Sequence, residues 1–325
     1  MKVVFLNPSL SSGHSGARSL RGVIAELRER GHDADVLEPA RPPAGGDLVV
    51  HLNDADLVVV DGTCPPALAE RIGDHHRRDG GYRLLFHATD PAAGTNSVDL
   101  SGYDGVLAGS EAICHRYLEA GWQGQSWAWR EAADTRIFHP LPAIEPDADL
   151  VAFASWSDAG QSAMLRDVLL HPARQLRLRG AIHGPPPPPL ARLRLRFARI
   201  HHRPPVADQA IPELFARHRL TVQIPFHPAP ISPFEALACG IPLISAPGGD
   251  ADGLFRPERD FLIARDCAET REAMQAVLEM PEFAAQLSQS GLEAVRAEHT
   301  CAHRARELLE IDAELSGAAP LEVAG

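Results

Sequence analysis

The sequence predicts an α/β protein made of two doubly wound domains, each built on a parallel sheet. Apolar runs without polar alternation indicate strands that are buried on both faces. Helical patterns separate these runs, as parallel crossovers require. A proline-rich polar stretch at 139–147 interrupts the alternation once and indicates a domain boundary. The length of 325 residues suits two domains of about 150 residues better than one.

The first half of the chain alternates strand and helix patterns. From Leu20, apolar side chains recur at i, i+3, i+4 and i+7, and Gly31 follows the last turn, so a helix is expected over 17–30. A second helix is expected between Ser110, which suits the N-cap position, and Gly121. The expected strands of this half are 3–6, 34–37, 57–60, 84–87 and 106–108.

The second half repeats this alternation, and the sequence divides into 1–142, 143–298 and a C-terminal helix and tail at 299–325. Five consecutive prolines at 185–189 predict a stiff surface connector, with a ligand for an SH3-type domain as the alternative. The expected strands are 150–154, 177–183, 220–224, 241–245 and 261–264. The expected helices are 161–170, 208–217, 232–239 and 268–279, and the chain is expected to be helical throughout 282–315.

The composition limits the partners and the location of the protein. Acidic residues outnumber basic ones, 43 to 31, which gives a net charge of −12. We therefore expect no overall electrostatic attraction to nucleic acid or to an anionic membrane, and a local basic site is the alternative that stays open. No apolar stretch approaches the roughly 18 residues that a membrane span needs. The apolar start at 3–6 is too short for a signal peptide, and five scattered cysteines suit a reducing compartment, so a cytoplasmic location is expected.

Two such domains are expected to face each other across a cleft at the carboxyl ends of their strands, where helix N-termini present free N–H groups. The first βα turn, residues 9–16, contains Gly13, His14 and Gly16 and would let the backbone approach a ligand closely. It lacks the first glycine of the dinucleotide fingerprint, so NAD or FAD is poorly supported. An ordinary turn without a ligand is an equal alternative.

His87 is a candidate catalytic residue because it leaves the carboxyl end of an expected strand, where its near-neutral pKa suits hydrogen bonding or proton transfer. A structural histidine is the alternative, since the chain contains 16 histidines. Asp90 follows closely and either positions His87 or starts a turn with Pro91.

The segment 232–245 combines a helix start, small and apolar residues, a glycine stop and a buried strand. The carboxylate of Glu235 in the first turn can accept two hydrogen bonds from the cis-diol of a ribose, and the helix start can receive a diphosphate. Ser232 and Glu235 also have the spacing of a capping box, in which the carboxylate folds back onto the N–H of Ser232. The spacing alone favours the cap.

The stretch EALACGIPLIS, which begins at Glu235, resembles the donor-site helix and strand of GT-B glycosyltransferases, specifically the CgeB-like (spore-maturation-type) group. The resemblance runs in order over almost the whole chain, through 100–108, 131–136, 253–266 and 297–304. It implies a GT-B fold, a nucleotide-sugar donor held mainly by the C-terminal domain, and an acceptor held mainly by the N-terminal domain.

The resemblance also implies roles for individual residues. Glu235 corresponds to the glutamate on the ribose hydroxyls, and we expect Ser232 and Phe234 beside it in the donor site. His87 corresponds to the cleft histidine near the reacting centre, and the turn from Gly13 to Gly16 corresponds to the glycine-rich loop near the transferred sugar.

The sequence departs from the family pattern in two places. Related enzymes often carry a second glutamate eight residues before the first, but here that position is His227, which we count among the donor-site candidates. Ser232-Pro233 replaces a basic residue, so a charge-assisted contact with the diphosphate is lost. Arg256 or Arg265 could supply the missing charge.

Several Asp-x-Asp triplets occur, of which Asp250 and Asp252, after two glycines, could line the donor pocket. The others, at 33–35, 54–56 and 147–149, are interpreted as solvated turns, and no metal site is expected because GT-B enzymes neutralise the leaving diphosphate with helix dipoles and basic side chains. The tryptophans at 122, 127, 129 and 156 are expected to pack in the core, with a sugar-stacking platform as the alternative.

These observations predict a metal-independent glycosyltransferase of the hexosyltransferase type, with His87 and Asp90 as catalytic candidates. It would move a sugar from a nucleotide-sugar donor to an unidentified small molecule, glycan or protein. No cofactor beyond the nucleotide sugar, no nucleic-acid partner and no membrane span are expected. A catalytically silent GT-B scaffold that binds a nucleotide, sugar or protein is the alternative; a GT-B epimerase is a third hypothesis, and an NAD-dependent enzyme is the least supported.

Overall fold

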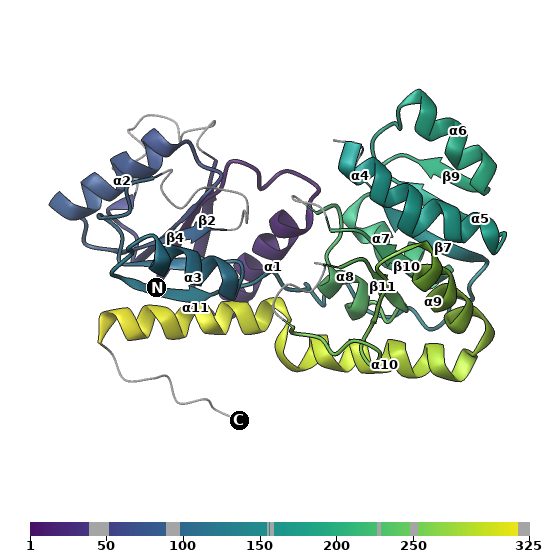
Figure 1. The fold of residues 1–325 in the computed structure, drawn as a ribbon. Coiled ribbons are helices and arrows are strands. Elements are labelled where there is room, and N and C mark those ends of the chain that lie inside the picture. The colour runs from purple at the N-terminus through teal and green to yellow at the C-terminus, as the bar shows by residue number, and fades with distance from the viewer. Residues whose placement is uncertain are drawn as a thin grey trace. The chain divides into compact units, whose positions relative to one another are not determined.

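The computed structural model describes residues 1–38, 52–88, 98–154, 156, 159–225, 229–247 and 253–317. Contacts divide these residues into two compact units (Figure 1). Unit 1 comprises the described residues within Met1–Ser12, Ala17–Glu131 and Cys301–Gly325, and unit 2 those within Gly13–Gly16 and Ala132–Thr300. In this division the proline-containing segment 139–146 belongs to unit 2, and the C-terminal helix returns to unit 1.

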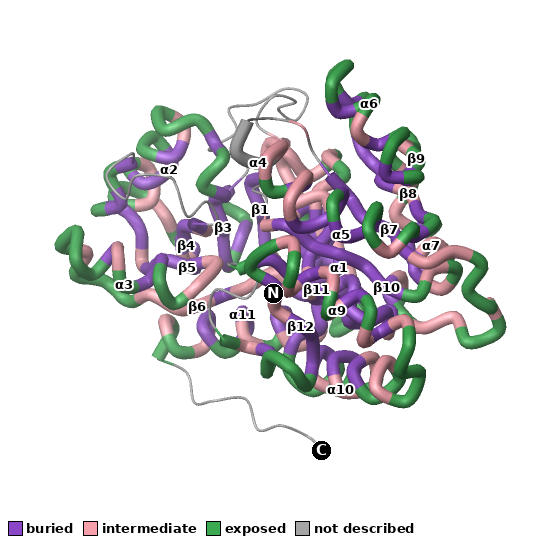
Figure 2. The backbone as a smooth tube through the Cα atoms, turned by 45° about the vertical axis from the view of Figure 1, so that its right-hand side comes forward, coloured by how far each residue is buried: buried purple, intermediate pink, exposed green. Residues whose placement is uncertain are grey.

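Unit 1 is built on a parallel sheet of six strands in the order β2-β1-β3-β4-β5-β6. The strands are β1 (Lys2–Leu6), β2 (Asp33–Leu37), β3 (Leu57–Asp61), β4 (Arg83–Ala88), β5 (Gly105–Ala108) and β6 (Gln125–Ala128). The helices are α1 (Ser15–Glu29), α2 (Pro66–Asp79), α3 (Glu111–Glu119) and α11 (Cys301–Ser316). Every residue of β3 and β5 is buried, as expected for strands covered on both faces (Figure 2).

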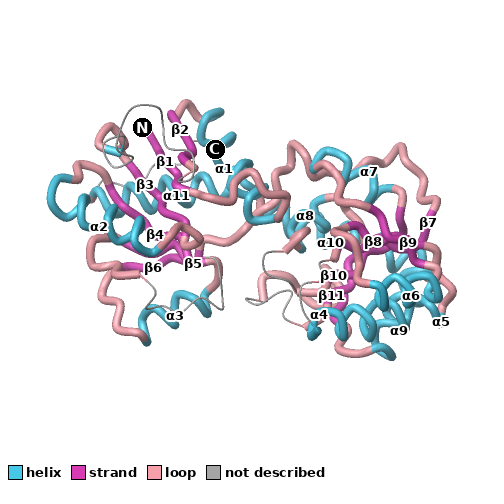
Figure 3. The backbone as a smooth tube through the Cα atoms, turned by 90° about the horizontal axis from the view of Figure 1, so that it is seen from above, coloured by secondary structure: helices cyan, strands magenta, loops and turns pink. Residues whose placement is uncertain are grey.

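Unit 2 carries a second parallel sheet of six strands, in the order β12-β11-β10-β7-β8-β9 (Figure 3). The strands are β7 (Ala148–Phe153), β8 (Gly180–His183), β9 (Ile200–Arg203), β10 (His218–Gln223), β11 (Leu243–Ser245) and β12 (Leu262–Ile263). The helices are α4 (Ala159–Met164), α5 (His171–Gln175), α6 (Pro189–Ala198), α7 (Ile211–Ala216), α8 (Pro233–Ala238), α9 (Cys267–Glu279) and α10 (Pro281–Glu298). A π-helix (Leu165–Leu170) joins α4 to α5, and a 3₁₀ turn (Asp208–Ala210) leads into α7.

Each sheet has one point at which the strand order reverses. In unit 1 the chain runs from β1 outward to β2 and then returns to the other side of β1 as β3. In unit 2 it runs from β7 through β8 and β9 and then returns to the other side of β7 as β10. Open parallel sheets bind ligands outside the carboxyl ends of the strands at such switch points. The carboxyl ends of β1/β3 and of β7/β10 are therefore the expected ligand-binding edges.

Helix α8 is held against α10 by a close approach at Gly291. A Cβ at this position would lie 2.6 Å from the backbone oxygen of Asp260 and 2.7 Å from Cδ2 of Leu237 on α8, so a larger residue does not fit. The buried Asp260 carboxylate accepts hydrogen bonds from the N–H of Arg256 and from Oγ of Ser290, which fixes the loop beside this contact. The packing gives the short helix α8 a defined position.

The sequence-based expectation of two parallel-sheet α/β domains is confirmed, and each expected strand has a counterpart. Two strands (β6 and β9) and two helices (α2 and α6) were not expected. The expectation that the chain is helical throughout 282–315 holds except at residues 299–300, because α10 ends at Glu298 and α11 begins at Cys301. Between them the carbonyl of His299 accepts the N–H of Ala133, and Thr300 forms a parallel bridge with Ala133, which turns the backbone out of the helix.

The expected strand over 177–183 starts later, at Gly180, because Arg177 follows α5 with a left-handed φ of 57°. Within the described residues, no helix has both the length and the apolar composition needed to cross a membrane.

Candidate functional site

The switch point of unit 1 carries a buried polar cluster. Asn7 directly follows β1, and its Nδ2 donates to Oδ2 of Asp61, the last residue of β3, at 3.0 Å. The other carboxylate oxygen, Oδ1, accepts hydrogen bonds from the backbone N–H of Thr63, at 2.9 Å, and from the Thr63 hydroxyl. Asp61 is therefore fixed from two sides at the edge where parallel sheets bind ligands.

His87 lies beside this carboxylate because Asp61 and His87 are paired in the register of β3 and β4. Nδ1 of His87 is 3.5 Å from Oδ2 of Asp61, and the two groups form an ion pair when the imidazole is protonated. The carbonyl of His87 also accepts the N–H of Gly62, at 2.8 Å. The His87 side chain is 13% exposed, so part of it is accessible to solvent.

The electrostatics of the cluster favour a charged Asp61. Burial on its own raises the pKa of this carboxyl, but hydrogen bonds with His87 and Thr63 and the attraction of His87 bring its pKa below the ordinary value. A charged aspartate next to a histidine stabilises the imidazolium and orients the ring.

Trp129 forms the wall behind His87. The two rings meet edge to face, with centroids 4.9 Å apart. Nε1 of Trp129 donates to the backbone oxygen of Arg304 in α11, at 3.0 Å, so the C-terminal helix fixes the indole that supports the histidine. The expected tryptophan group is not one cluster: Trp127 and Trp129 lie on and just after β6 in unit 1, whereas Trp156 lies in unit 2 and donates to the oxygen of Pro185.

The expected ligand turn runs into α1: Gly13 and His14 precede the helix, and Gly16 is its second residue. Asn7 shapes its first part, because Oδ1 of Asn7 accepts the N–H of Ser9 at 2.8 Å and the Ser9 hydroxyl at 3.1 Å. A Cβ on Gly13 would meet no atom within 4 Å, so packing does not require glycine there. The loop that is expected to contact the ligand therefore follows Asn7 closely in the chain.

Residues Gly13–Gly16 group with unit 2, in which the N–H of Ser15 donates to the oxygen of Ala229 at 2.9 Å. Two residues further on, the oxygen of Ile231 accepts Nε2 of Gln223, at 3.1 Å. Gln223 is the last residue of β10, at the switch point of the second sheet. The short segment 229–231, which leads directly into α8, is therefore held from two directions.

Two buried side-chain oxygens near this segment have no hydrogen-bond partner within the described part of the chain. They are Oγ of Ser15 and Oε1 of Gln223, the residues that hold Ala229 and Ile231. Buried polar atoms in native proteins are nearly always paired, with protein, water or a ligand. Their position before α8 marks this edge as a place where a polar ligand group would be favourable.

Helix α8 begins with the capping box that the spacing predicts. The N–H of Ser232 donates to Oε2 of Glu235 at 2.8 Å, and the N–H of Glu235 donates to Oγ of Ser232 at 3.2 Å. Both residues are buried. The box uses two of the donors at the helix start, and Pro233 supplies none, so the N–H of Phe234 is the donor that the cap does not use.

Phe234 is buried in an aromatic group at the same helix start. Its ring centroid lies 5.4 Å from that of Phe255 and 5.5 Å from that of His299. Phe234 therefore packs inward in the protein and orients the first turn of α8.

Several expected site residues are not placed by the structure. Asp90, His227 and Asp250 lie outside the described residues. Within the described residues, Asp61 is a carboxylate that lies beside His87. The arginines considered as replacements for a basic residue are both paired, Arg256 with Asp260 and Arg265 with Glu269. Within the described ranges no group of three histidine, cysteine or acidic side chains could hold a metal ion.

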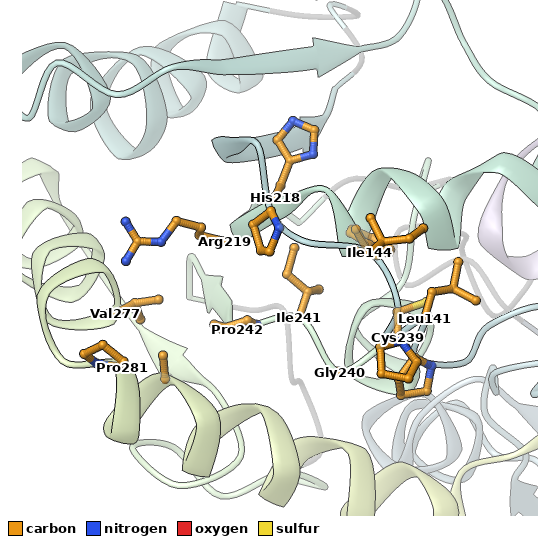
Figure 4. Close-up of a pocket in the computed structure, with 16 residues that line it drawn as sticks. Leu141, Ile144, His218, Arg219, Cys239, Gly240, Ile241, Pro242, Val277 and Pro281 are labelled. Atoms are coloured by element: carbon orange, nitrogen blue, oxygen red, sulfur yellow. The ribbon is translucent and has the colours of Figure 1, made fainter.

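A hollow of about 340 Å³ opens at the opposite, amino-terminal edge of the unit 2 sheet (Figure 4). Its walls are mainly proline and aliphatic residues. The basic side chains among its lining residues, His218 and Arg219, bond the backbone oxygens of Leu214 and Leu278. Burial lowers the pKa of His218. This hollow lies away from the carboxyl ends of the strands, where open parallel sheets bind their ligands.

Sequence reasoning missed Asn7, Asp61 and Gln223. Each one ends or directly follows a buried apolar strand, and a polar residue at that place is the signal that would have found them. For Asp61 the expected strand stopped one residue early, at Val60, so that the carboxylate was assigned to the following turn.

Two six-stranded parallel sheets, each with flanking helices and one switch point, define the GT-B class of fold, and comparisons with known proteins agree. Residues 166–310, a little under half of the chain, match a family model described as glycosyl transferase-like. This matched region contains Gln223, Ser232 and Glu235. No curated protein matches the sequence.

The chain is similar to solved structures over nearly its full length. Sucrose-phosphate synthase from Thermosynechococcus elongatus superposes with a TM-score of 0.71 at 15% identity, over 98% of this chain and 100% of that chain. HepE from Anabaena, solved in complex with UDP-glucose, gives 0.70 at 15% identity, over 97% and 100%. A glycosyltransferase from Rickettsia africae gives 0.72 at 13% identity, over 98% and 99%. At these identities the similarity establishes the GT-B fold.

Proposed function

We propose that this protein is a glycosyltransferase that transfers a sugar from a nucleotide-sugar donor to an acceptor. The observation that carries the proposal is the match of 166–310 to a glycosyl transferase-like family, because that region holds the capped start of α8 and the buried oxygen of Gln223 at the switch point. The structure of HepE contains UDP-glucose, which makes UDP-glucose the first donor to test. Within this class, the CgeB-like group is our finer assignment.

The donor is assigned to unit 2. A carboxylate offers about four acceptor positions, and the proposal assigns the ribose diol to Glu235 in addition to its capping bond with the Ser232 N–H. Phe234 supplies the N–H of the first turn that the cap does not use, and Gln223 supplies an acceptor for a sugar or ribose hydroxyl. His227 and Asp250 remain candidates for the same pocket.

The acceptor is assigned to unit 1, with His87 as the group that takes a proton from the attacking hydroxyl. Asp61 acts on the reaction through His87, as a positioning residue, because it orients the ring and stabilises its protonated form. Gly13, His14 and Gly16 form the loop assigned to the transferred sugar, and Asp90 is retained as a second catalytic candidate. We propose a hexosyl transfer without a metal ion, with amides and positioning lowering the barrier.

A second candidate function is a catalytically silent GT-B scaffold. The observation that favours it is the complete capping box, which consumes the N–H groups of Ser232 and Glu235, while Pro233 stands where a basic residue would contact a diphosphate. Such a start to α8 offers a diphosphate little electrostatic stabilisation.

Thermal unfolding with a panel of UDP, GDP, ADP and dTDP compounds tests whether a nucleotide binds at all. A ligand that binds only the native state stabilises it by about 2.7 kcal/mol at a hundred times its Kd. For a unit of this size, that corresponds to a rise in Tm of roughly 5–10 °C. The proposal expects such a rise with at least one nucleotide; no rise with any would contradict it. A rise without turnover of any donor would favour the silent scaffold.

A further inference from the structure

Helix α6 exposes three large apolar side chains along one face. Leu190, Leu193 and Phe197 are 59%, 51% and 62% exposed. Their spacing places them within about 60° of one another around the helix axis. The helix packs on unit 2 through another face, formed by Ala191, Leu195 and Ala198. Figures 1 and 2 show α6 at the outer edge of its unit, next to the edge strand β9.

Arginines border this apolar stripe on both sides. At about 100° per residue, Arg194 lies about 40° from Leu190 on one side, and Arg196 lies about 60° from Leu193 on the other. The apolar side chains are therefore in the middle of the exposed face and the cations are at its margins. A basic helix with this distribution is typical of segments that lie in a membrane interface.

A basic hollow of about 260 Å³ lies between α6 and β9. Its lining includes Arg192, Arg196 and Arg199, together with His201 and His202 from β9. Nε of Arg192 donates to the oxygen of Pro187, and Nε2 of His202 bonds the oxygens of Gly184 and Pro185. Arg199 adopts a left-handed φ of 59° at the end of α6, which turns the chain back into β9 and brings the two elements together. Guanidinium groups bind phosphate oxygens in a bidentate fashion, so the hollow suits a phosphate-bearing headgroup.

The charge of this region differs from that of the rest of the chain. Residues 168–207 contain eight arginines and no aspartate or glutamate, whereas the whole protein carries a net charge of −12. A single region thus provides the local basic site that the overall charge leaves open. The complementary partner is an anionic surface, and the exposed leucines and phenylalanine require that surface to accept apolar groups.

We propose that α6 docks the protein onto an anionic lipid bilayer. Leu190, Leu193 and Phe197 enter the boundary between headgroups and acyl chains, and the flanking arginines bind lipid phosphates. A nucleic-acid site would place cations, not leucines, at the centre of the contact. This inference does not depend on the proposed transferase activity.

Flotation of the full-length protein with lipid vesicles tests the docking. Vesicles of phosphatidylcholine with about 30% phosphatidylglycerol are compared with pure phosphatidylcholine vesicles, at about 0.1 M and about 0.5 M salt. Leu193→Ser with Phe197→Ser is expected to lower the partition coefficient about tenfold or more. The matched control is Leu118→Ser with Met280→Ser, which removes two similarly exposed apolar side chains elsewhere and should leave binding unchanged.

The charge is tested separately. Arg194→Gln with Arg196→Gln is expected to lower binding to the anionic vesicles about tenfold or more, and high salt should act in the same direction. The control, Arg77→Gln with Arg78→Gln on α2, should have little effect. Equal binding to neutral vesicles, or binding that survives both α6 variants, would overturn the proposal. So would binding to a labelled oligonucleotide, or dimerisation through α6, in the absence of vesicle binding.

Discussion

The double role assigned to Glu235 gives the sharpest prediction about the donor site. Its carboxylate accepts the buried N–H of Ser232 at 2.8 Å and is also assigned to the ribose of a nucleotide. Two substitutions separate these roles. Glu235→Gln keeps an oxygen that can accept the Ser232 N–H but loses the negative charge. Glu235→Ala removes the oxygen, the charge and most of the buried side chain.

The expected stability changes follow from these contacts. Glu235→Ala leaves a buried N–H without a partner, which costs about 1–3 kcal/mol, and breaks a capping box whose loss costs about 1 kcal/mol. Relief from burying a charge offsets part of this, so we expect a net loss of about 2–3 kcal/mol. In a unit of this size the Tm falls by roughly 5–10 °C. Glu235→Gln should lower the stability by about 1 kcal/mol or less.

Nucleotide affinity should respond differently. The ribose hydroxyls donate to a charged acceptor, and the difference between a charged and a neutral acceptor is worth about 1–1.5 kcal/mol, or roughly tenfold in Kd. Isothermal titration calorimetry with the nucleotide found in the thermal screen, at a temperature where all variants are folded, measures this effect. Glu235→Gln should therefore raise the nucleotide Kd roughly tenfold, although it lowers the free energy of unfolding by only about 1 kcal/mol or less.

Asp266→Ala is the matched control, because Asp266 caps α9 through the N–H groups of Ala268 and Glu269 and lies outside the proposed site. It should lower the stability by about 1 kcal/mol without changing the nucleotide Kd. If Glu235→Gln and Glu235→Ala behave in the same way as this control, losing stability with an unchanged Kd, Glu235 is a helix cap only and its assignment to the ribose is refuted.

Three further predictions concern unit 1. Asp61→Asn should weaken the support of His87 and lower kcat more than it changes KM in steady-state kinetics, since a neutral partner no longer holds the ring through a charged contact. The folded-state pKa of Asp61 is below its ordinary value of 3.8, so its contribution to stability should be complete above pH 3.8 and disappear as the pH falls through the folded-state pKa. Urea unfolding at a series of pH values measures this loss, and the Asp61→Asn variant should lack this part of the acid sensitivity. Gly102→Ala places a Cβ 2.3 Å from the backbone oxygen of Gly73 and should cost about 1–3 kcal/mol or more in chemical unfolding, whereas Gly81→Ala, where no atom lies within 4 Å, should be nearly neutral.

The sequence predicted the elements whose patterns depend on burial from both sides. A short run that is buried throughout, such as Leu57–Asp61, is typical of a parallel strand covered on both faces, so such strands were predicted correctly. Helix α6 was missed because leucine and arginine alternate in it after five prolines, which does not give the periodicity of a helix with one apolar face. Its exposed stripe, on a different face from the buried one, is the reason for that irregular pattern.

The candidate site shows the same division between local and long-range information. The capping box of Ser232 and Glu235 is a local pattern, and it forms as the spacing predicts. The Asp61 carboxylate beside His87 is not a local neighbour, because the register of β3 against β4 brings it to the ring from 26 positions earlier in the chain. Sequence spacing cannot supply such a register, because it depends on which strands become neighbours in the sheet.

The central claim, that the protein transfers a sugar from a nucleotide donor, is tested most directly by measuring nucleoside diphosphate released from a panel of nucleotide sugars, with UDP-glucose first. Anion-exchange chromatography quantifies the product for the wild type and for His87→Ala, with folding of each checked by circular dichroism. The account predicts release from at least one donor and a loss of about a hundredfold or more in the His87 variant. A folded wild-type protein that binds a nucleotide but releases no diphosphate from any donor or acceptor mixture, or a His87→Ala variant with full activity, would contradict it.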